Sequence, residues 1–233
     1  MKRFLYKLLL GKKEYNHPIR ISAYQNVTRN LRQIWNNEKH NDVGFEKVLR
    51  LFLVSVQFAF PGLHMRNLFG RFGTIGRNVA VEFYVVFKTL LPFIFLSTGL
   101  YQHLWAVVIS CYLLLETMFY VTSLIFVSDM FVKPRSYRRN ILMLSFNYLE
   151  ISLSFAVIYA GLHLLGDQPQ SFVDYIYFSI VTSTTIGYGD FHPHGDLAKT
   201  MVCIQAVLVV SFIVLFLNFF SSKVETLHHQ DEA

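Results

Sequence analysis

Residues 184–190, with the one-letter sequence TTIGYGD, form a short polar and glycine-rich stretch between two long apolar runs. Irregular backbone at membrane depth is tolerated only where it is buried in protein or lines a water-filled path. Gly187 and Gly189 allow left-handed and right-handed backbone conformations to alternate, so that successive carbonyls can point the same way. A row of such carbonyls, with the Thr185 hydroxyl below it, can replace the hydration shell of a cation.

The string TIGYGD at residues 185–190 resembles the selectivity filter of potassium channels, with an isoleucine where many members carry valine. Residues 174–179 resemble the pore helix of that family, and the likeness covers residues 142–220. The resemblance implies a potassium-selective channel that conducts K+ passively. It implies no enzymatic step and no cofactor apart from the permeant K+ ions.

The resemblance also implies the roles of the residues around the filter. Asp190 would lie behind the filter and bond to Tyr177, which stands where many members have tryptophan. Thr184 would support the filter from directly before it. Val181 stands where some members place a carboxylic acid, so that second brace is expected to be absent. The implied ion-binding residues are Thr185, Ile186, Gly187, Tyr188 and Gly189, with K+ held at the first four.

Ser171 and Asp174 have the spacing of a capping box, Ser-x-x-Asp. This pair predicts the start of a pore helix that runs to about residue 183 or 184. The carboxyl end of that helix would carry partial negative charge toward the centre of the membrane.

Composition predicts an all-α membrane protein, because 53% of the 233 residues are hydrophobic and the apolar residues gather in long runs. We expect four transmembrane helices per subunit, a re-entrant pore helix with the filter, and a homotetramer, since one filter string supplies a quarter of a ring of carbonyls. The predicted spans are residues 79–100, 104–127, 141–165 and 197–220. The first predicted region is a basic cytoplasmic N-terminal region at 1–78, with an interfacial helix at 51–63 that Pro61 ends. Two additional transmembrane helices at 79–128 and a cytoplasmic loop at 129–140 follow. The pore module is at 141–221, and a short cytoplasmic tail is at 222–233.

Residues 1–80 contain fourteen Lys and Arg residues and four acids. Under the positive-inside rule this region stays in the cytoplasm, and an even number of spans places both termini there. We expect an integral protein of the cell membrane. Anionic lipids are a candidate partner of the basic region, residues 1–10 being a basic amphipathic segment at the membrane surface. The alternative is a topology signal with a solvated surface.

The family also contains voltage sensors, which carry a basic residue at every third position of a helix within the field. Arg135, Arg138 and Arg139 have a similar spacing. They follow Pro134 in a predicted loop, however, and only two spans precede the pore module. The sequence therefore indicates the non-voltage-sensing type.

Several polar residues fall within the predicted spans. Counting about 1.5 Å per residue from the inner ends puts Lys88 and Glu150 at similar depths of about 12 and 14 Å, whereas Glu116 lies about 18 Å deep. Lys88 and Glu150 are therefore the candidate intramembrane ion pair, with a proton relay as the alternative. The inner helix contains neither a hinge glycine nor a proline pair. Its polar residues are candidates either for lining the pore or for bonding between helices: Gln205, Ser211 and Asn218.

Three other functions compete with the potassium-selective channel. A weakly selective monovalent cation channel would share the fold, but the tyrosine and second glycine of the filter disfavour it. A potassium transporter with a filter-like loop would have four linked pore repeats in one chain. A non-conducting scaffold would have no reason to keep the filter string intact.

Overall fold

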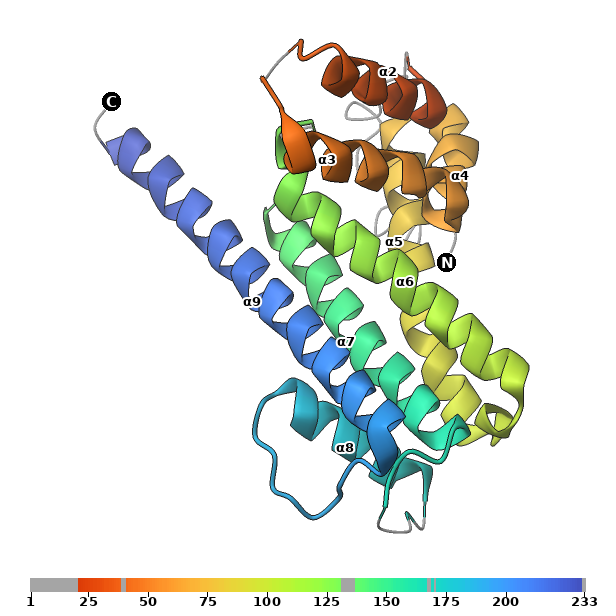
Figure 1. Cartoon of the computed structure of the whole chain (residues 1–233). Coiled ribbons are helices and arrows are strands. Elements are labelled where there is room, and N and C mark those ends of the chain that lie inside the picture. The colour runs from red at the N-terminus through yellow and green to blue at the C-terminus, as the bar shows by residue number, and fades with distance from the viewer. Residues whose placement is uncertain (1–20, 39–40, 131–136, 167–168, 170, 232–233) are drawn as a thin grey trace. The chain divides into compact units, whose positions relative to one another are not determined.

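The computed structural model describes residues 21–38, 41–130, 137–166, 169 and 171–231. The chain divides into two compact units, and helices α5 and α6 contribute to both. The first unit is Met1–Val86 with Thr122–Val132, and the second is Phe87–Val121 with Lys133–Ala233. Figure 1 shows the elements in chain order. The described part is helical, which confirms the all-α fold class.

The first unit contains a small helical arrangement before the first long helix. Helix α2 (Ala23–Trp35) begins with a capping box, in which Ser22 and Gln25 each accept a hydrogen bond from the other's backbone N–H at 3.1 Å. Helix α3 (Gly44–Val56) packs on α2, and helix α4 (Pro61–Phe69) follows a short 3-10 turn. The predicted interfacial helix at 51–63 is therefore wrong in its bounds. Pro61 begins a helix, because the first helical position needs no N–H donor.

Arg50 on α3 is a buried cation in this unit. Its guanidinium donates to Asp42 at 3.1 Å and to Asp129 at 2.6 Å. Asp129 lies in the 3-10 turn Ser128–Met130 that follows helix α6 (Leu104–Phe126). The ion pairs therefore join α3 to the turn at the carboxyl end of α6. The predicted basic amphipathic segment at residues 1–10 lies outside the described residues.

Four helical stretches of the described chain are long and apolar enough to cross a membrane, by length and composition. They are Pro61–Ser97, which includes helix α5 (Gly73–Ser97), then Leu104–Phe126, Arg138–Gly161 and Gly195–Leu217. The four predicted spans are thus present, with shifted ends. The chain is an integral membrane protein.

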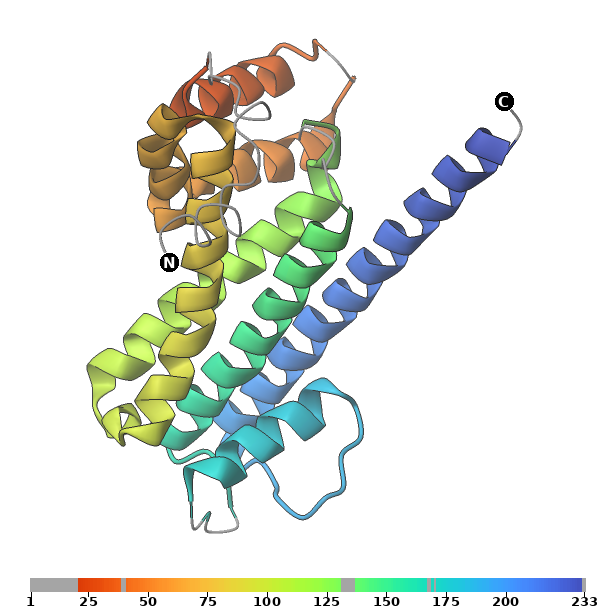
Figure 2. The ribbon, with the colours of Figure 1, turned by 180° about the vertical axis from the view of Figure 1, so that it is seen from behind.

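The second unit is organised around helix α7 (Tyr137–Gly161), which contacts the short helix α8 (Phe172–Ser183) and the long helix α9 (Gly195–Asp231). Residues 155–160 of α7 are all buried, so this stretch of the helix is covered on every side. Figures 1 and 2 show α8 across the carboxyl end of α7 and the amino end of α9.

Two region boundaries differ from prediction. Helix α7 begins at Tyr137, so the final residues of the predicted 129–140 loop are helical, while 131–136 lie outside the described residues. Helix α9 continues to Asp231 through most of the predicted tail at 222–233. The loop ends around the candidate filter meet in a β-bridge between Leu165 and Pro193.

Candidate functional site

Helix α8 directs the chain into the candidate filter, which we define as residues 185–189. The Asp174 carboxylate accepts a hydrogen bond from the Ser171 backbone N–H at 3.0 Å, which satisfies a donor at the start of the helix. The helix ends at Ser183, where the expected pore helix ends. The Thr184 hydroxyl then donates to the Ile180 carbonyl at 2.9 Å, so the last turn is capped by the residue before the filter.

The backbone of the candidate filter alternates in handedness. Thr185, Gly187 and Gly189 have φ angles of +58°, +57° and +78°, whereas the two residues between them do not have positive φ. Glycine adopts this conformation without steric cost, but a β-branched threonine does so only under strain. Strain of this kind is typical of functional sites. The alternation is the backbone geometry that lets successive carbonyls point the same way.

The candidate filter is open in a single chain. Ile186 and Tyr188 are 54% and 69% exposed. No atom lies within 4 Å of a Cβ built on Gly187 or Gly189, apart from the chain neighbours. One chain therefore does not surround a cation, and a ring of carbonyls would need further copies of this segment.

Tyr177 on α8 lies beside the filter and the residue that follows it. Its ring stacks on Tyr188 with 6.4 Å between centroids and 3° between planes, and it meets Phe191 edge-on at 6.2 Å. The Tyr177 hydroxyl donates a hydrogen bond to Asp190, and this bond is the main reason that the pKa of Tyr177 is raised to about 12. Val181 is buried and carries no carboxylate. The structure thus brings Tyr177 and Asp190 together behind the filter.

Gln205 is fully buried between three helices, so the suggestion that it lines a pore is wrong. Its Oε1 accepts a hydrogen bond from the Tyr159 hydroxyl on α7 at 2.7 Å. Its Nε2 donates to the Ser183 hydroxyl at 2.6 Å and to the Ser179 carbonyl at 2.9 Å, both on α8. Of the two roles that the sequence left open for this residue, the geometry is that of bonding between helices.

The other two polar residues of α9 are placed differently. Ser211 is partly exposed and donates to the Val207 carbonyl of its own helix at 3.0 Å. The side chain of Asn218 lies outside the described part of the chain. Neither residue has a described contact with another helix that would assign it to the pore or to the bundle.

The candidate ion pair lies in the interior of the second unit. Lys88 on α5 and Glu150 on α7 are 3.8 Å apart, with side chains 5% and 0% exposed. Thr117 on α6 lies between them: it accepts a hydrogen bond from the Lys88 ammonium and donates to the Glu150 carboxylate at 2.6 Å. Ser154 donates to the other carboxylate oxygen at 3.2 Å. Sequence analysis missed Thr117, because a threonine in an apolar helix has no charge to mark it.

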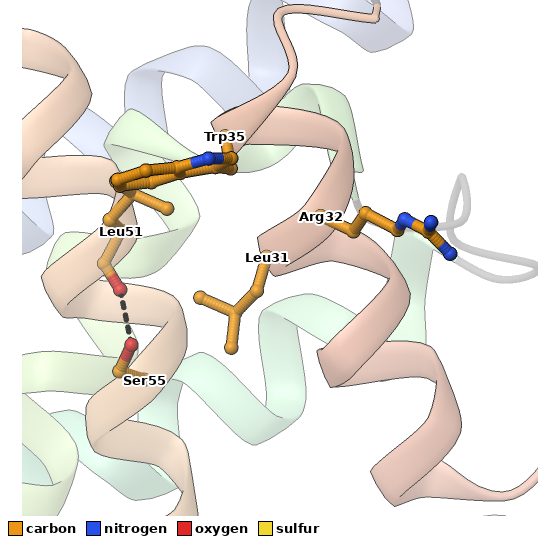
Figure 3. A pocket seen from close by; sticks show the side chains of 5 residues that line it. All are labelled: Leu31, Arg32, Trp35, Leu51 and Ser55. Carbon is orange, nitrogen blue, oxygen red and sulfur yellow. Dashed lines mark hydrogen bonds between the residues drawn. The ribbon is translucent and has the colours of Figure 1, made fainter.

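Outside the pore module, a pocket of about 410 Å³ opens between α2 and α3 (Figure 3). In that view the Arg32 guanidinium points away from Trp35 and Leu51, and the Ser55 hydroxyl is occupied by the Leu51 carbonyl at 2.8 Å. The side chains that line this pocket do not bring polar groups together inside it. It is an apolar recess, and we assign it no ligand.

Comparison with known families identifies one domain. Residues 146–226 match the family model described as "Ion channel". This match covers most of α7, all of α8, the candidate filter and most of α9. It begins after α5 and α6 and therefore leaves the N-terminal region unmatched.

The curated relatives that match the chain include potassium channels of plants and bacteria. Two pore potassium channel a of Oryza sativa subsp. japonica is 30% identical over 91 residues, which are 39% of this chain and 26% of that protein. Two-pore potassium channel 4 of Arabidopsis thaliana is 36% identical over 87 residues, 36% of this chain and 29% of that protein. Inward rectifier potassium channel Kirbac3.1 of Paramagnetospirillum magnetotacticum is 40% identical over 62 residues, which are 26% of this chain and 21% of that protein. The chain thus spans less than a third of each relative. No solved structure matches it.

Proposed function

We propose that the chain, whose residues 146–226 match the ion-channel family model and which is similar to potassium channels, forms a potassium-selective channel in which four copies surround one pore. The observation that carries this proposal is the alternating backbone of Thr185, Gly187 and Gly189 at the end of a capped pore helix. K+ is the substrate, and it crosses the membrane passively.

In the proposed filter, four equivalent strands present rings of oxygen atoms to dehydrated K+. The Thr185 hydroxyl and carbonyl form the inner ring, and the carbonyls of Ile186, Gly187 and Tyr188 form those above it. Gly189 completes the alternation. The Tyr188 ring lies against Tyr177, so it is held away from the carbonyl column. The Thr185 hydroxyl donates its hydrogen to the Thr184 carbonyl at 2.7 Å, so its oxygen lone pairs remain available to K+.

The burial pattern supports an assembly of several copies. In α7, 56% of the most apolar stretch is buried within the chain, whereas in α9 the share is 28%. The uncovered side of α9 includes Val207, Val210 and Leu217. Neighbouring copies and lipid would cover this apolar face, because neither water nor a polar partner suits it. With one filter strand per chain, a homotetramer completes the ring.

The carboxyl end of α8 supports conduction electrostatically. The last carbonyls of a helix carry partial negative charge. In the tetramer, four such ends would point at the water-filled cavity below the filter and stabilise a cation there. The Tyr148 hydroxyl donates to the Ser183 carbonyl at 3.0 Å and so reduces the negative charge that this carbonyl presents to the cavity.

We further propose a cell-membrane location with both termini in the cytoplasm, where the N-terminal region contacts anionic lipids. Helix α3 supports this placement, since Phe45, Val48 and Phe52 are exposed along one side of it. Trp35 is 68% exposed beside them, and the Lys47 ammonium lies 5.8 Å from the centre of its ring. An exposed apolar stripe with tryptophan and lysine is the pattern of a helix that lies at the membrane surface.

Ion flux tests the proposed function. The purified full-length chain, reconstituted in liposomes, should pass K+ and Rb+ far faster than Na+, and Ba2+ should block the flux. Equal permeation of Na+ and K+ would instead indicate the weakly selective cation channel. Absence of flux in vesicles that contain correctly assembled protein would exclude both.

A further inference from the structure

A network of buried hydroxyls and one amide lies directly behind the candidate filter. Ser179 and Ser183 of α8, Ser152 and Tyr159 of α7 and Gln205 of α9 are all at most 2% exposed. Ser183 is the last residue of the pore helix, two positions before the first filter residue. The network therefore holds the part of the pore helix from which the filter starts.

The Gln205 amide joins α9 to both of the other helices. Its carbonyl oxygen accepts from Tyr159, and its NH2 group donates to Ser183 Oγ at 2.6 Å and to Ser179 O and Oγ at 2.9 and 3.0 Å. The amide orientation follows from these partners, because the Ser179 carbonyl is only an acceptor. The Ser179 hydroxyl is itself committed as a donor to the Ser152 carbonyl at 2.6 Å.

We propose that Gln205 is a positioning residue that sets where the end of the pore helix lies against the inner helix, and that it thereby determines the K+ over Na+ selectivity of the filter. The inference rests on the proposed function, since it concerns the same filter. Cation selectivity depends on the number and placement of the coordinating oxygens. A displacement of Ser183 moves the adjacent residues 184 and 185 with it.

The inner helix is suited to hold such a position. Residues 200–220 contain no glycine or proline, so α9 has no interior hinge in its sequence. Motion of α9 at the level of Gln205 therefore reaches the pore helix through the amide rather than being absorbed by a bend. A buried glutamine whose amide oxygen and NH2 group are both hydrogen-bonded also favours one arrangement of the helices, because any other arrangement would leave these polar atoms unpaired.

Four single variants separate positioning from packing. Gln205→Met keeps volume and removes every hydrogen bond of the amide. Ser183→Ala removes the hydroxyl at the end of the pore helix, which accepts from Gln205 and from the Ser152 hydroxyl of α7. Tyr159→Phe removes only the bond between Gln205 and α7. Ser211→Ala is the matched control on the same helix, because its hydroxyl bonds only to its own helix.

Each variant is reconstituted as the full-length chain, and K+ and Na+ flux are measured beside the thermal stability of the assembly. We expect the K+/Na+ ratio to fall about tenfold or more for Gln205→Met and Ser183→Ala, as for loss of one buried hydrogen bond. Tyr159→Phe should lower thermal stability with the ratio retained, and Ser211→Ala should change neither. Gln205→Met/Ser183→Ala should be no less selective than the worse single variant, since both break the same contact.

Retained selectivity in either Gln205→Met or Ser183→Ala would overturn the inference, whatever the change in stability. If Gln205→Met does not assemble, Ser183→Ala decides alone, because it removes a single hydroxyl. An equal loss of selectivity in Tyr159→Phe would also overturn it, since general loosening would then explain the effect. If the parent protein shows no preference for K+, both the proposed function and this inference are wrong. If the parent and the variants are all selective, only the inference is wrong.

Discussion

Gly187→Ala tests whether the backbone conformation of the filter carries the function. Gly187 has φ of +57°, and a Cβ built there has open space around it. Steric exclusion by neighbours therefore plays no part within one chain. The substitution acts through the left-handed backbone, which alanine adopts at a cost of about 1–2 kcal/mol whereas glycine takes either sign of φ about equally.

The magnitude follows from four copies. A bias of about 1 kcal/mol favours the right-handed conformation roughly fivefold at each position. If the copies relax independently, about one channel in a thousand has all four carbonyls in place, against about one in sixteen for glycine without bias. We therefore expect K+ flux to fall by about two orders of magnitude with expression and assembly retained.

Gly195→Ala is the matched control. Gly195 has φ of +82°, also with open space at its Cβ, and it begins α9 outside the filter. It should incur a similar loss of stability and keep K+ selectivity in the liposome flux assay. The reasoning is refuted if Gly187→Ala conducts K+ selectively at the parent rate. It is also refuted if both alanine variants lose flux in proportion to their loss of thermal stability.

Three further substitutions test the polar contacts around the pore module and in the N-terminal unit. Lys88→Met should destabilise the assembly by about 3–5 kcal/mol, because it leaves a buried carboxylate without its cation. Lys88→Met/Glu150→Gln should recover part of this loss in a thermal unfolding assay, and no recovery would contradict the pairing. Tyr177→Phe keeps the ring stack but removes the hydrogen bond to the aspartate behind the filter, so K+/Na+ selectivity should fall with assembly unchanged; the parent ratio in this variant would rule out the brace. Asp42→Asn should lower the melting temperature more than Asp129→Asn, since the side chain of the first is 5% exposed and that of the second 27%; the reverse order would argue against the buried arginine as the anchor.

The features that the sequence predicts well are those that depend on local chemistry. The pore helix begins at an Ser-x-x-Asp pair and ends at Ser183 because its cap and its length are both encoded nearby. The positive φ angles at Gly187 and Gly189 follow from the residue type. The four apolar stretches identify membrane-length helices through composition alone. The ion-channel family model matches the same segment, residues 146–226.

Helix ends were predicted less well because the signals at those positions are ambiguous. Pro61 disfavours a continuing helix but is favoured at the first helical position, and only the fold decides between these roles. The sequence analysis predicts a short tail from residue 222, yet α9 continues to Asp231. Lys, Glu and Gln are good helix formers, so polarity alone does not end a helix.

Contacts between helices were the hardest to predict, because counting residues gives depth in the membrane but not rotation about the helix axis. The residue count places Lys88 and Glu150 at similar depths, and in the structure their charged groups lie 3.8 Å apart. The same count could not tell whether Gln205 faces a pore or a neighbouring helix. It also could not find Thr117, whose hydroxyl lies between the two charges.

Helix α7 connects the two buried polar clusters, which approach it at the same level from different sides. Glu150 bonds to Thr117 of α6, and Ser152 bonds to Ser179 and Ser183 of α8. Two positions along an α-helix differ by about 200° in direction, so these contacts lie on nearly opposite faces of one turn. Because α7 is buried on every side just beyond this turn, it cannot yield locally to either cluster. A change in the packing of α5 and α6 would therefore reach the pore helix as a displacement of α7 itself.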